Sequence, residues 1–112
     1  MLDNPPIFVF ILCGLIYIIT GQLVLRYPPK KINAFYGYRT AGSKRSQAHW
    51  DFAQKESSKY IIQSGYYCLL TSVPFILFDS GKAGIWIAII LTTLYPFVSI
   101  FQTEKALKKK FG

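Results

Sequence analysis

The stretch "YIIQSGYYCLLTSVPFILF", from Tyr60 to Phe78, contains no charged side chain. A helix of this length crosses the hydrocarbon core of a bilayer, because each residue adds about 1.5 Å and the core is roughly 30 Å thick. Two more uncharged stretches follow the same pattern: "IFVFILCGLIYIITGQLVL" from Ile7 to Leu25, and "GIWIAIILTTLYPFVSIF" from Gly84 to Phe101. A chain of 112 residues that is 52% hydrophobic has too little interior to bury this material in a soluble core. The sequence therefore predicts an all-α integral membrane protein.

We expect a single membrane domain, residues 1–112, in which turn and helix-breaking residues separate the helices. Pro28 and Pro29 end the first helix, because a residue that precedes proline is disfavoured in the α-helical conformation. "DSGK", residues 79–82, is a short turn that makes the last two helices an antiparallel hairpin. The expected segments are membrane helices at about 7–27, 60–78 and 84–101, a loop with a helical extension at 28–59, and a basic tail at 102–112.

Small residues recur at helical spacing and mark the faces on which the helices pack. The positions are Gly14 and Gly21 in the first helix, Ser64, Cys68 and Thr71 or Ser72 in the second, and Gly84, Ala88, Thr92 and Pro96 in the third. We expect these faces to form a three-helix bundle. The alternative is a seam between copies of the chain in a homo-oligomer.

The positive charges predict an orientation, because Lys and Arg are enriched on the cytoplasmic side of membrane proteins. Outside the apolar stretches, residues 26–59 carry eight Lys and Arg residues and the tail carries four, whereas the N-terminus has none and the hairpin only Lys82. We therefore expect the N-terminus to lie outside, and the loop and the C-terminus to lie in the cytoplasm. The net charge of +8 is mainly a consequence of this topology.

The loop "PPKKINAFYGYRTAGSK", from Pro28 to Lys44, mixes basic and aromatic residues. Proteins that bind single-stranded nucleic acid use such mixtures, but so do segments beside a membrane, where aromatic rings favour the interface and Lys and Arg contact anionic lipid headgroups. Because membrane helices flank this loop, we expect lipid headgroups and not nucleic acid as its partner. Ser43 or Ser46 can cap the helical extension that follows.

Within this loop, "INAFYGYRT" has an order that charge and aromaticity alone do not require. Gly37 between Tyr36 and Tyr38 indicates a tight turn or a positive φ angle. Arg39 supplies a planar guanidinium that can hold a carboxylate, a phosphate or backbone carbonyls. The turn either fastens the loop beneath the bundle or forms an anion site.

The residues that enzymes use for catalysis are sparse. His49 is the only histidine, and no cysteine or carboxylate near it has the spacing of metal ligands. The apolar stretches also lack the Asp, Glu or His that proton-coupled transport usually requires. We expect a protein without enzymatic activity, metal or cofactor.

At these residues the sequence resembles the SdpI-like (SdpI/YfhL) family of bacterial multi-pass membrane proteins. The resemblance rests on "PPKKINAFYGYRT" and on "HWDFA" before the second apolar stretch; the matching positions are Asn33, Gly37, Tyr38, Arg39, Thr40, Ser43, Trp50 and Ala53. It implies a protein of the bacterial inner membrane that gives immunity to a membrane-active peptide toxin, or that signals to a cytoplasmic regulator. The namesake of the family is longer, so this implication covers the shared unit only.

The leading hypothesis is thus an immunity-type membrane protein with the G-Y-R-T turn as its binding face. The candidate binding residues are Asn33, Tyr36, Gly37, Tyr38, Arg39, Thr40, Ser43, His49 and Trp50. The first alternative is a small oligomeric transporter or lipid-binding protein whose cavity forms between protomers. The second is an enzyme that acts on lipid headgroups.

Overall fold

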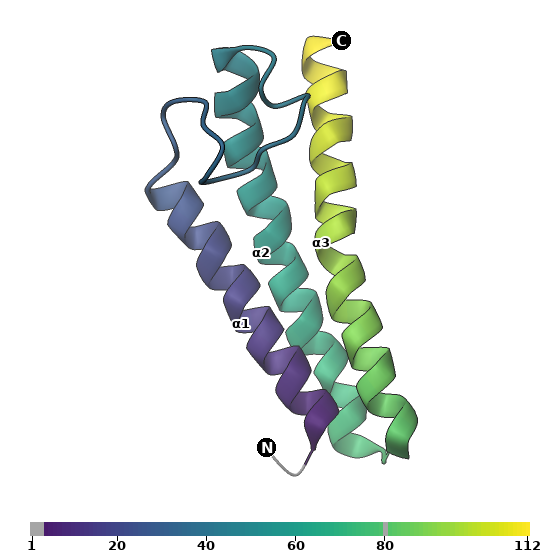
Figure 1. The fold of residues 1–112 in the computed structure, drawn as a ribbon. Coiled ribbons are helices and arrows are strands. Elements are labelled where there is room, and N and C mark those ends of the chain that lie inside the picture. The colour runs from purple at the N-terminus through teal and green to yellow at the C-terminus, as the bar shows by residue number, and fades with distance from the viewer. Residues whose placement is uncertain (1–3, 80) are drawn as a thin grey trace.

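The computed structural model describes residues 4–79 and 81–112, which form three α-helices and contain no β-strand. The helices are α1 (Pro5–Arg26), α2 (Gln47–Leu77) and α3 (Gly81–Phe111). Each is long and apolar enough to cross a membrane. Figure 1 shows an elongated bundle in which the α2–α3 hairpin turn lies at the same end as the beginning of α1. The predicted all-α fold with three membrane-crossing helices is confirmed.

Capping side chains define where the first two helices begin. The Asn4 side chain accepts a hydrogen bond from the backbone N–H of Ile7, and Pro5 and Pro6 occupy the first turn of α1, where a missing N–H has no cost. Ser46 caps α2 by accepting from the N–H of His49 at 3.1 Å. The predicted helical extension before the second apolar stretch is therefore present, and it begins at Gln47.

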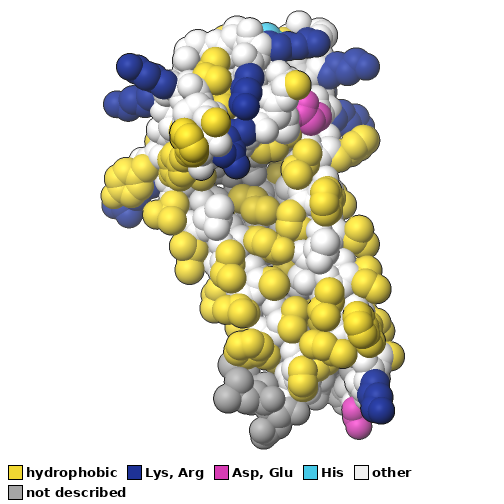
Figure 2. All heavy atoms as spheres, in the orientation of Figure 1, with side chains coloured by type: hydrophobic (Ala, Val, Ile, Leu, Met, Phe, Trp, Pro, Cys, Tyr) yellow, Lys and Arg dark blue, Asp and Glu magenta, His cyan; other side chains and the backbone are white. Residues whose placement is uncertain are grey.

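α2 and α3 are longer than the membrane requires. Each has 31 residues, roughly 46 Å at 1.5 Å per residue, against a hydrocarbon core of about 30 Å. The segment expected as a basic tail, 102–112, continues α3 as a helix as far as Phe111. We call residues 27–59 and 102–112 the basic end. Figure 2 shows most of the Lys and Arg side chains gathered there, above a body covered by hydrophobic side chains.

Glycine brings α1 and α2 into backbone contact. A Cβ atom on Gly65 of α2 would lie 2.5 Å from Cγ1 of Ile18 and 2.6 Å from the carbonyl oxygen of Gly14, both in α1. A Cβ atom on Gly21 would lie 2.8 Å from the carbonyl oxygen of Ser58. These distances are below van der Waals contact, so only glycine fits at the crossing. Small residues at such positions let membrane helices approach closely.

Hydroxyl groups join α3 to the other two helices. Ser64 Oγ of α2 lies 2.5 Å from Ser99 Oγ of α3, and both side chains are buried. Tyr17 of α1 donates its hydroxyl to the carbonyl oxygen of Thr92 in α3, at 2.6 Å. Thr92 is four residues before Pro96, which lacks the N–H that would otherwise bond this carbonyl. Tyr17 thus supplies the donor that Pro96 removes, and it ties α1 to α3.

The predicted packing faces are largely buried in the bundle. Gly14, Gly21, Ser64, Cys68, Gly84, Ala88 and Thr92 are buried, and Pro96 is half-buried. The faces meet within one chain, as expected for an intramolecular bundle. A homo-oligomer stays a prediction.

We expect Gly65→Ala to destabilise the bundle by about 1–3 kcal/mol, the usual cost of forcing an extra methyl group into a packed interior. The reason is that its Cβ has no space against Ile18 and Gly14. Thermal unfolding of the detergent-solubilised protein, followed by circular dichroism, measures the effect. Leu70→Ala on the same helix is the control, because Leu70 is 68% exposed on the lipid-facing surface. Equal midpoints for the two variants would contradict the close crossing.

Candidate functional site: the loop at the basic end

Residues 27–46 form a loop that leaves α1, crosses to α3 and returns to the start of α2 (Figure 1). The loop first turns at Asn33, whose side chain forms hydrogen bonds with backbone groups two or three residues away. Asn33 Oδ1 accepts from the N–H groups of Phe35 at 2.9 Å and Tyr36 at 2.8 Å, and Nδ2 donates to the carbonyl of Lys31 at 2.9 Å. Asparagine favours such turns because its short side chain reaches backbone groups two or three residues away. The role of Asn33 is therefore to shape the loop.

Two aromatic side chains close the junction between α1 and the loop. The Tyr36 hydroxyl donates to the carbonyl of Tyr27 at 2.9 Å, just beyond the last turn of α1. Buried Trp50 of α2 donates its indole N–H to the carbonyl of Pro29 at 2.6 Å. Carbonyl groups at and beyond a helix end have no partner inside the helix, so these donors stabilise the junction.

Gln54 of α2 pairs with the backbone of Tyr38. Its Oε1 accepts from the Tyr38 N–H at 2.7 Å, and its Nε2 donates to the Tyr38 carbonyl at 2.7 Å. Gln54 is 1% exposed, so its side-chain amide would lack a water partner if the pair were broken. One amide side chain thus satisfies both backbone groups of one loop residue.

Gly37 allows this pairing through its conformation and its size. Its φ angle is 91°, which confirms the positive φ expected from the sequence and which side chains other than glycine rarely adopt. A Cβ atom at Gly37 would lie 2.4 Å from Gln54 Oε1 and 2.6 Å from Cγ of Pro29. Glycine is therefore required on both conformational and steric grounds.

Glu104 of α3 accepts hydrogen bonds from two side chains of the same turn. The Tyr38 hydroxyl donates to Glu104 Oε1 at 2.7 Å, and the Thr40 hydroxyl donates to the same oxygen. Ser43 is buried and bonds Thr40 reciprocally: Ser43 Oγ accepts from the Thr40 N–H at 2.9 Å, and the Ser43 N–H donates to Thr40 Oγ1 at 3.1 Å. Burial, and then the Glu104 carboxylate, hold the pKa of the Tyr38 phenol well above its usual range, so this hydroxyl remains a donor.

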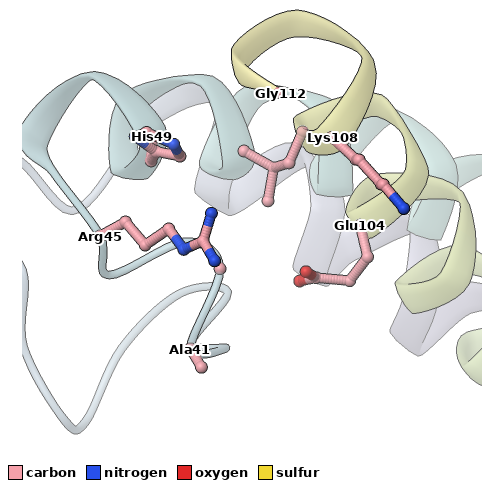
Figure 3. A pocket seen from close by; sticks show the side chains of 8 residues that line it. Ala41, Arg45, His49, Glu104, Lys108 and Gly112 are labelled. Atoms are coloured by element: carbon pink, nitrogen blue, oxygen red, sulfur yellow. The ribbon is translucent and has the colours of Figure 1, made fainter.

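His49 forms a separate contact with the last turn of α3. Its Nδ1 lies 2.5 Å from Ser46 Oγ, and its ring stacks on Phe111 with centroids 4.0 Å apart. A cleft of about 380 Å³ lies beside it, between the loop and α3, and Figure 3 shows Arg45, His49, Glu104 and Lys108 around this space. The last turn of α3 is thus attached to the first turn of α2.

The structure brings together only part of the predicted site. Tyr38 and Thr40 both bond Glu104, Ser43 bonds Thr40, and Gly37 lies against Gln54. The other candidates lie elsewhere: Asn33 shapes the start of the loop, Tyr36 and Trp50 bond the junction with α1, and His49 stacks on Phe111. Arg39 is exposed, and its guanidinium donates to the carbonyl of Ala34, as anticipated for a planar donor group beside backbone. The predicted turn therefore does fasten the loop to the bundle.

Sequence reasoning missed Gln54 and Glu104, the two side chains to which the turn is bonded. Each had a weak signal in the sequence. Gln54 follows Trp50 by one helical turn and so shares its face, and Glu104 is the one acidic residue in the segment 102–112. Among residues 4–79 and 81–112, no group of three or more His, Cys, Asp and Glu side chains could hold a metal ion.

Three membrane-crossing helices and an ordered basic loop define a multi-pass membrane protein. A model of the SdpI/YfhL protein family matches residues 30–101, which include the G-Y-R-T turn, α2 and most of α3. The chain belongs to the SdpI/YfhL family, and the resemblance seen in the sequence is confirmed. It is similar to the uncharacterized protein YfhL of Bacillus subtilis (strain 168), with 34% identity over 95 residues that cover 85% of this chain and 82% of that protein. No solved structure matches the chain.

We expect Gln54→Leu to destabilise the protein by about 1–3 kcal/mol, because it leaves the part-buried N–H of Tyr38 without a partner and removes the shorter of the two hydrogen bonds to the Tyr38 carbonyl. The loop should also become sensitive to trypsin at Lys44 and Arg45. Thermal unfolding and limited proteolysis in detergent measure the two effects. The matched control is Gln63→Leu, the same change at an exposed position of α2. A loop that resists trypsin equally in both variants would contradict the anchoring role of Gln54.

Proposed function

We propose that this protein is a non-enzymatic membrane protein of the immunity type, which protects a bacterial cell against a membrane-active peptide toxin. Membership of the SdpI/YfhL family supports this class, since immunity is what the family resemblance implies. The observation that carries the proposal is the anchoring of the G-Y-R-T turn to two helices through Gln54 and Glu104. These bonds hold the turn in one conformation, as a pre-formed binding face requires.

The proposed binding face consists of the residues that this anchoring leaves exposed. Phe35 is 91% exposed, and Arg39 lies four residues away on the same short loop. Asn33, Gly37, Tyr38, Thr40 and Ser43 hold this face in place and are positioning residues. A face that is already ordered loses less conformational entropy when a partner binds, which favours recognition. The partner is the peptide toxin itself or a cytoplasmic regulator that reports its presence.

The proposed location is the bacterial cytoplasmic membrane, with the basic end inside the cell and the N-terminus outside. The concentration of Lys and Arg at one end of the molecule supports this orientation (Figure 2). The same charges favour anionic lipid headgroups as neighbours and not nucleic acid. A homo-oligomer is a further proposal, and native mass spectrometry of the purified protein would count its copies.

Expression in a toxin-sensitive strain should raise survival, and Phe35→Ala and Arg39→Ala should each reduce that protection several-fold. Neither change touches the anchoring bonds of Tyr38, so the variants should reach normal membrane levels. Lys105→Ala is the matched control, because it removes one exposed positive charge from the same end of the molecule. Survival is counted as colonies after exposure to toxin, and protein levels are measured by immunoblot.

Two results would contradict the proposal at different points. Unchanged killing despite normal levels of the wild-type protein would exclude immunity to that toxin. Full protection by Phe35→Ala and Arg39→Ala would agree with immunity but would show that the binding face lies elsewhere.

The orientation predicts which cysteines a membrane-impermeant maleimide reaches. In a background with Cys13→Ala and Cys68→Ala, we expect Lys82→Cys to be labelled in intact cells. Lys109→Cys should be labelled only after the cells are permeabilised, because it lies at the basic end. The reverse pattern would overturn the proposed orientation.

A further inference from the structure

The cleft beside His49 is bordered by charged groups that the anchoring of the loop does not use. It has a volume of about 380 Å³ and lies between the loop and the end of α3. Figure 3 shows Arg45 reaching into this space from the loop and Glu104 reaching into it from α3. Lys108, one helical turn beyond Glu104, and the buried side chain of Leu107 also line the cleft. Both signs of charge therefore border one space.

The two cationic side chains of this cleft are not paired within the part of the chain that the structure describes. Neither Arg45 nor Lys108 forms a hydrogen bond or an ion pair there, and the one ion pair joins Lys59 to Glu56. Although Arg45 and Glu104 line the same space, no nitrogen of the one lies within 4.0 Å of a carboxylate oxygen of the other. A guanidinium presents parallel donors that match the oxygens of a phosphate or carboxylate group. The cations are therefore available to an oxyanion.

Glu104 has one oxygen that is bonded to the loop and one that is not. Oε1 accepts from the hydroxyls of Tyr38 and Thr40, whereas Oε2 has no hydrogen-bond partner among residues 4–79 and 81–112. Gly42 leaves room for Oε2, since a Cβ atom on Gly42 would lie 2.5 Å from it. The carboxylate would repel a simple anion, and the two cations would repel a simple cation. A ligand that carries both charges fits this arrangement.

The number of donors indicates which oxyanion the cleft accepts. His49 is fixed by its contacts with Ser46 and Phe111, and its other ring nitrogen, Nε2, has no partner among the described residues. Arg45, Lys108 and His49 are more donors than the two oxygens of a carboxylate need, and a phosphate offers three or four oxygens. We propose that this cleft binds a small zwitterion of the phosphoethanolamine type, with its phosphate at Arg45 and Lys108 and its ammonium at Glu104 Oε2.

The depth of the cleft allows two sources for this ligand. Glu104 lies three residues, about 4.5 Å, beyond Phe101, where the uncharged stretch ends, so the cleft begins at the level of the lipid headgroups. The zwitterion is thus a soluble phosphoethanolamine compound or the headgroup of phosphatidylethanolamine. The site goes beyond the proposed immunity function, and its test measures binding alone.

Isothermal titration calorimetry of the full chain in maltoside micelles tests the site, because this detergent carries neither phosphate nor ammonium. We expect one O-phosphoethanolamine molecule to bind per chain. Inorganic phosphate, which lacks the ammonium, should bind about tenfold more weakly, equivalent to roughly 1.4 kcal/mol. Ethanolamine, which lacks the phosphate, should give no measurable binding.

Single substitutions separate the two halves of the ligand. Arg45→Gln should weaken phosphoethanolamine binding by about tenfold. Lys44→Gln is the matched control, because Lys44 is exposed on the same loop and does not line the cleft. Glu104→Gln retains an oxygen that can accept from Tyr38 and Thr40 but removes the charge, so it should bind phosphoethanolamine and phosphate equally.

A second cation variant keeps the test independent of the Glu104 substitution. Lys108→Gln should also weaken phosphoethanolamine binding, whereas Lys109→Gln, an exposed lysine outside the cleft, should not. If Glu104→Gln does not fold, the comparison of phosphoethanolamine with phosphate on the wild-type protein still tests the ammonium contact.

Lipid nanodiscs identify the source of the ligand. If the headgroup of phosphatidylethanolamine occupies the cleft, soluble phosphoethanolamine should bind the protein in phosphatidylglycerol nanodiscs and not in phosphatidylethanolamine nanodiscs. Equal binding in both would identify the soluble compound as the ligand.

The site would be excluded by any of three results in micelles. The first is no binding of phosphoethanolamine to the wild-type protein, and the second is undiminished binding by both Arg45→Gln and Lys108→Gln. The third is equal binding of phosphoethanolamine and phosphate by the wild-type protein, which would remove the ammonium contact and with it the preference for a zwitterion.

Discussion

The structure depends on one constraint: a backbone N–H or carbonyl that is shielded from water must find its partner within the protein. Regular helices satisfy this constraint by themselves, and the informative places are those where they do not. At Pro96 the ring removes an N–H, and the carbonyl of Thr92 receives a hydrogen bond from Tyr17 of another helix. A local defect in α3 thereby becomes a contact between α1 and α3, and this contact fixes where the two helices separate.

The same constraint explains the order of residues in the loop. The carbonyls of Tyr27 and Pro29 are bonded by Tyr36 and Trp50, and the two backbone groups of Tyr38 are bonded by the single amide of Gln54. Residue 37 must be glycine, because the Gln54 amide occupies the space that a Cβ atom there would need. Tyr38 and Thr40 then reach Glu104 of α3. The motif is therefore mostly a device that fixes the loop, and recognition falls to the side chains that it leaves exposed.

The fold could be predicted from the sequence because its main determinant is local. Uncharged stretches, capping residues such as Ser46, and the positive φ angle at Gly37 can all be read from neighbouring residues. The partners of the turn could not be predicted in the same way. Glu104 lies 66 positions from Tyr38 and among lysines, so its segment reads as a charged tail. Gln54 is one polar residue among several at the start of α2, and only the tertiary structure shows that it is buried.

The attachment of the loop to α3 also has a consequence for the order of assembly. A ribosome releases α1, the loop and α2 before it releases Glu104 and Phe111, and chains fold from the N-terminus during synthesis. The close α1–α2 crossing at Gly65 can form at that stage, and Gln54 can already bond Tyr38. The loop nevertheless lacks its contacts with α3 until the final helix has inserted into the bilayer. A nascent chain that stalls within α3 would therefore carry a paired α1–α2 unit with a half-fastened loop, a state open to capture by quality-control proteases.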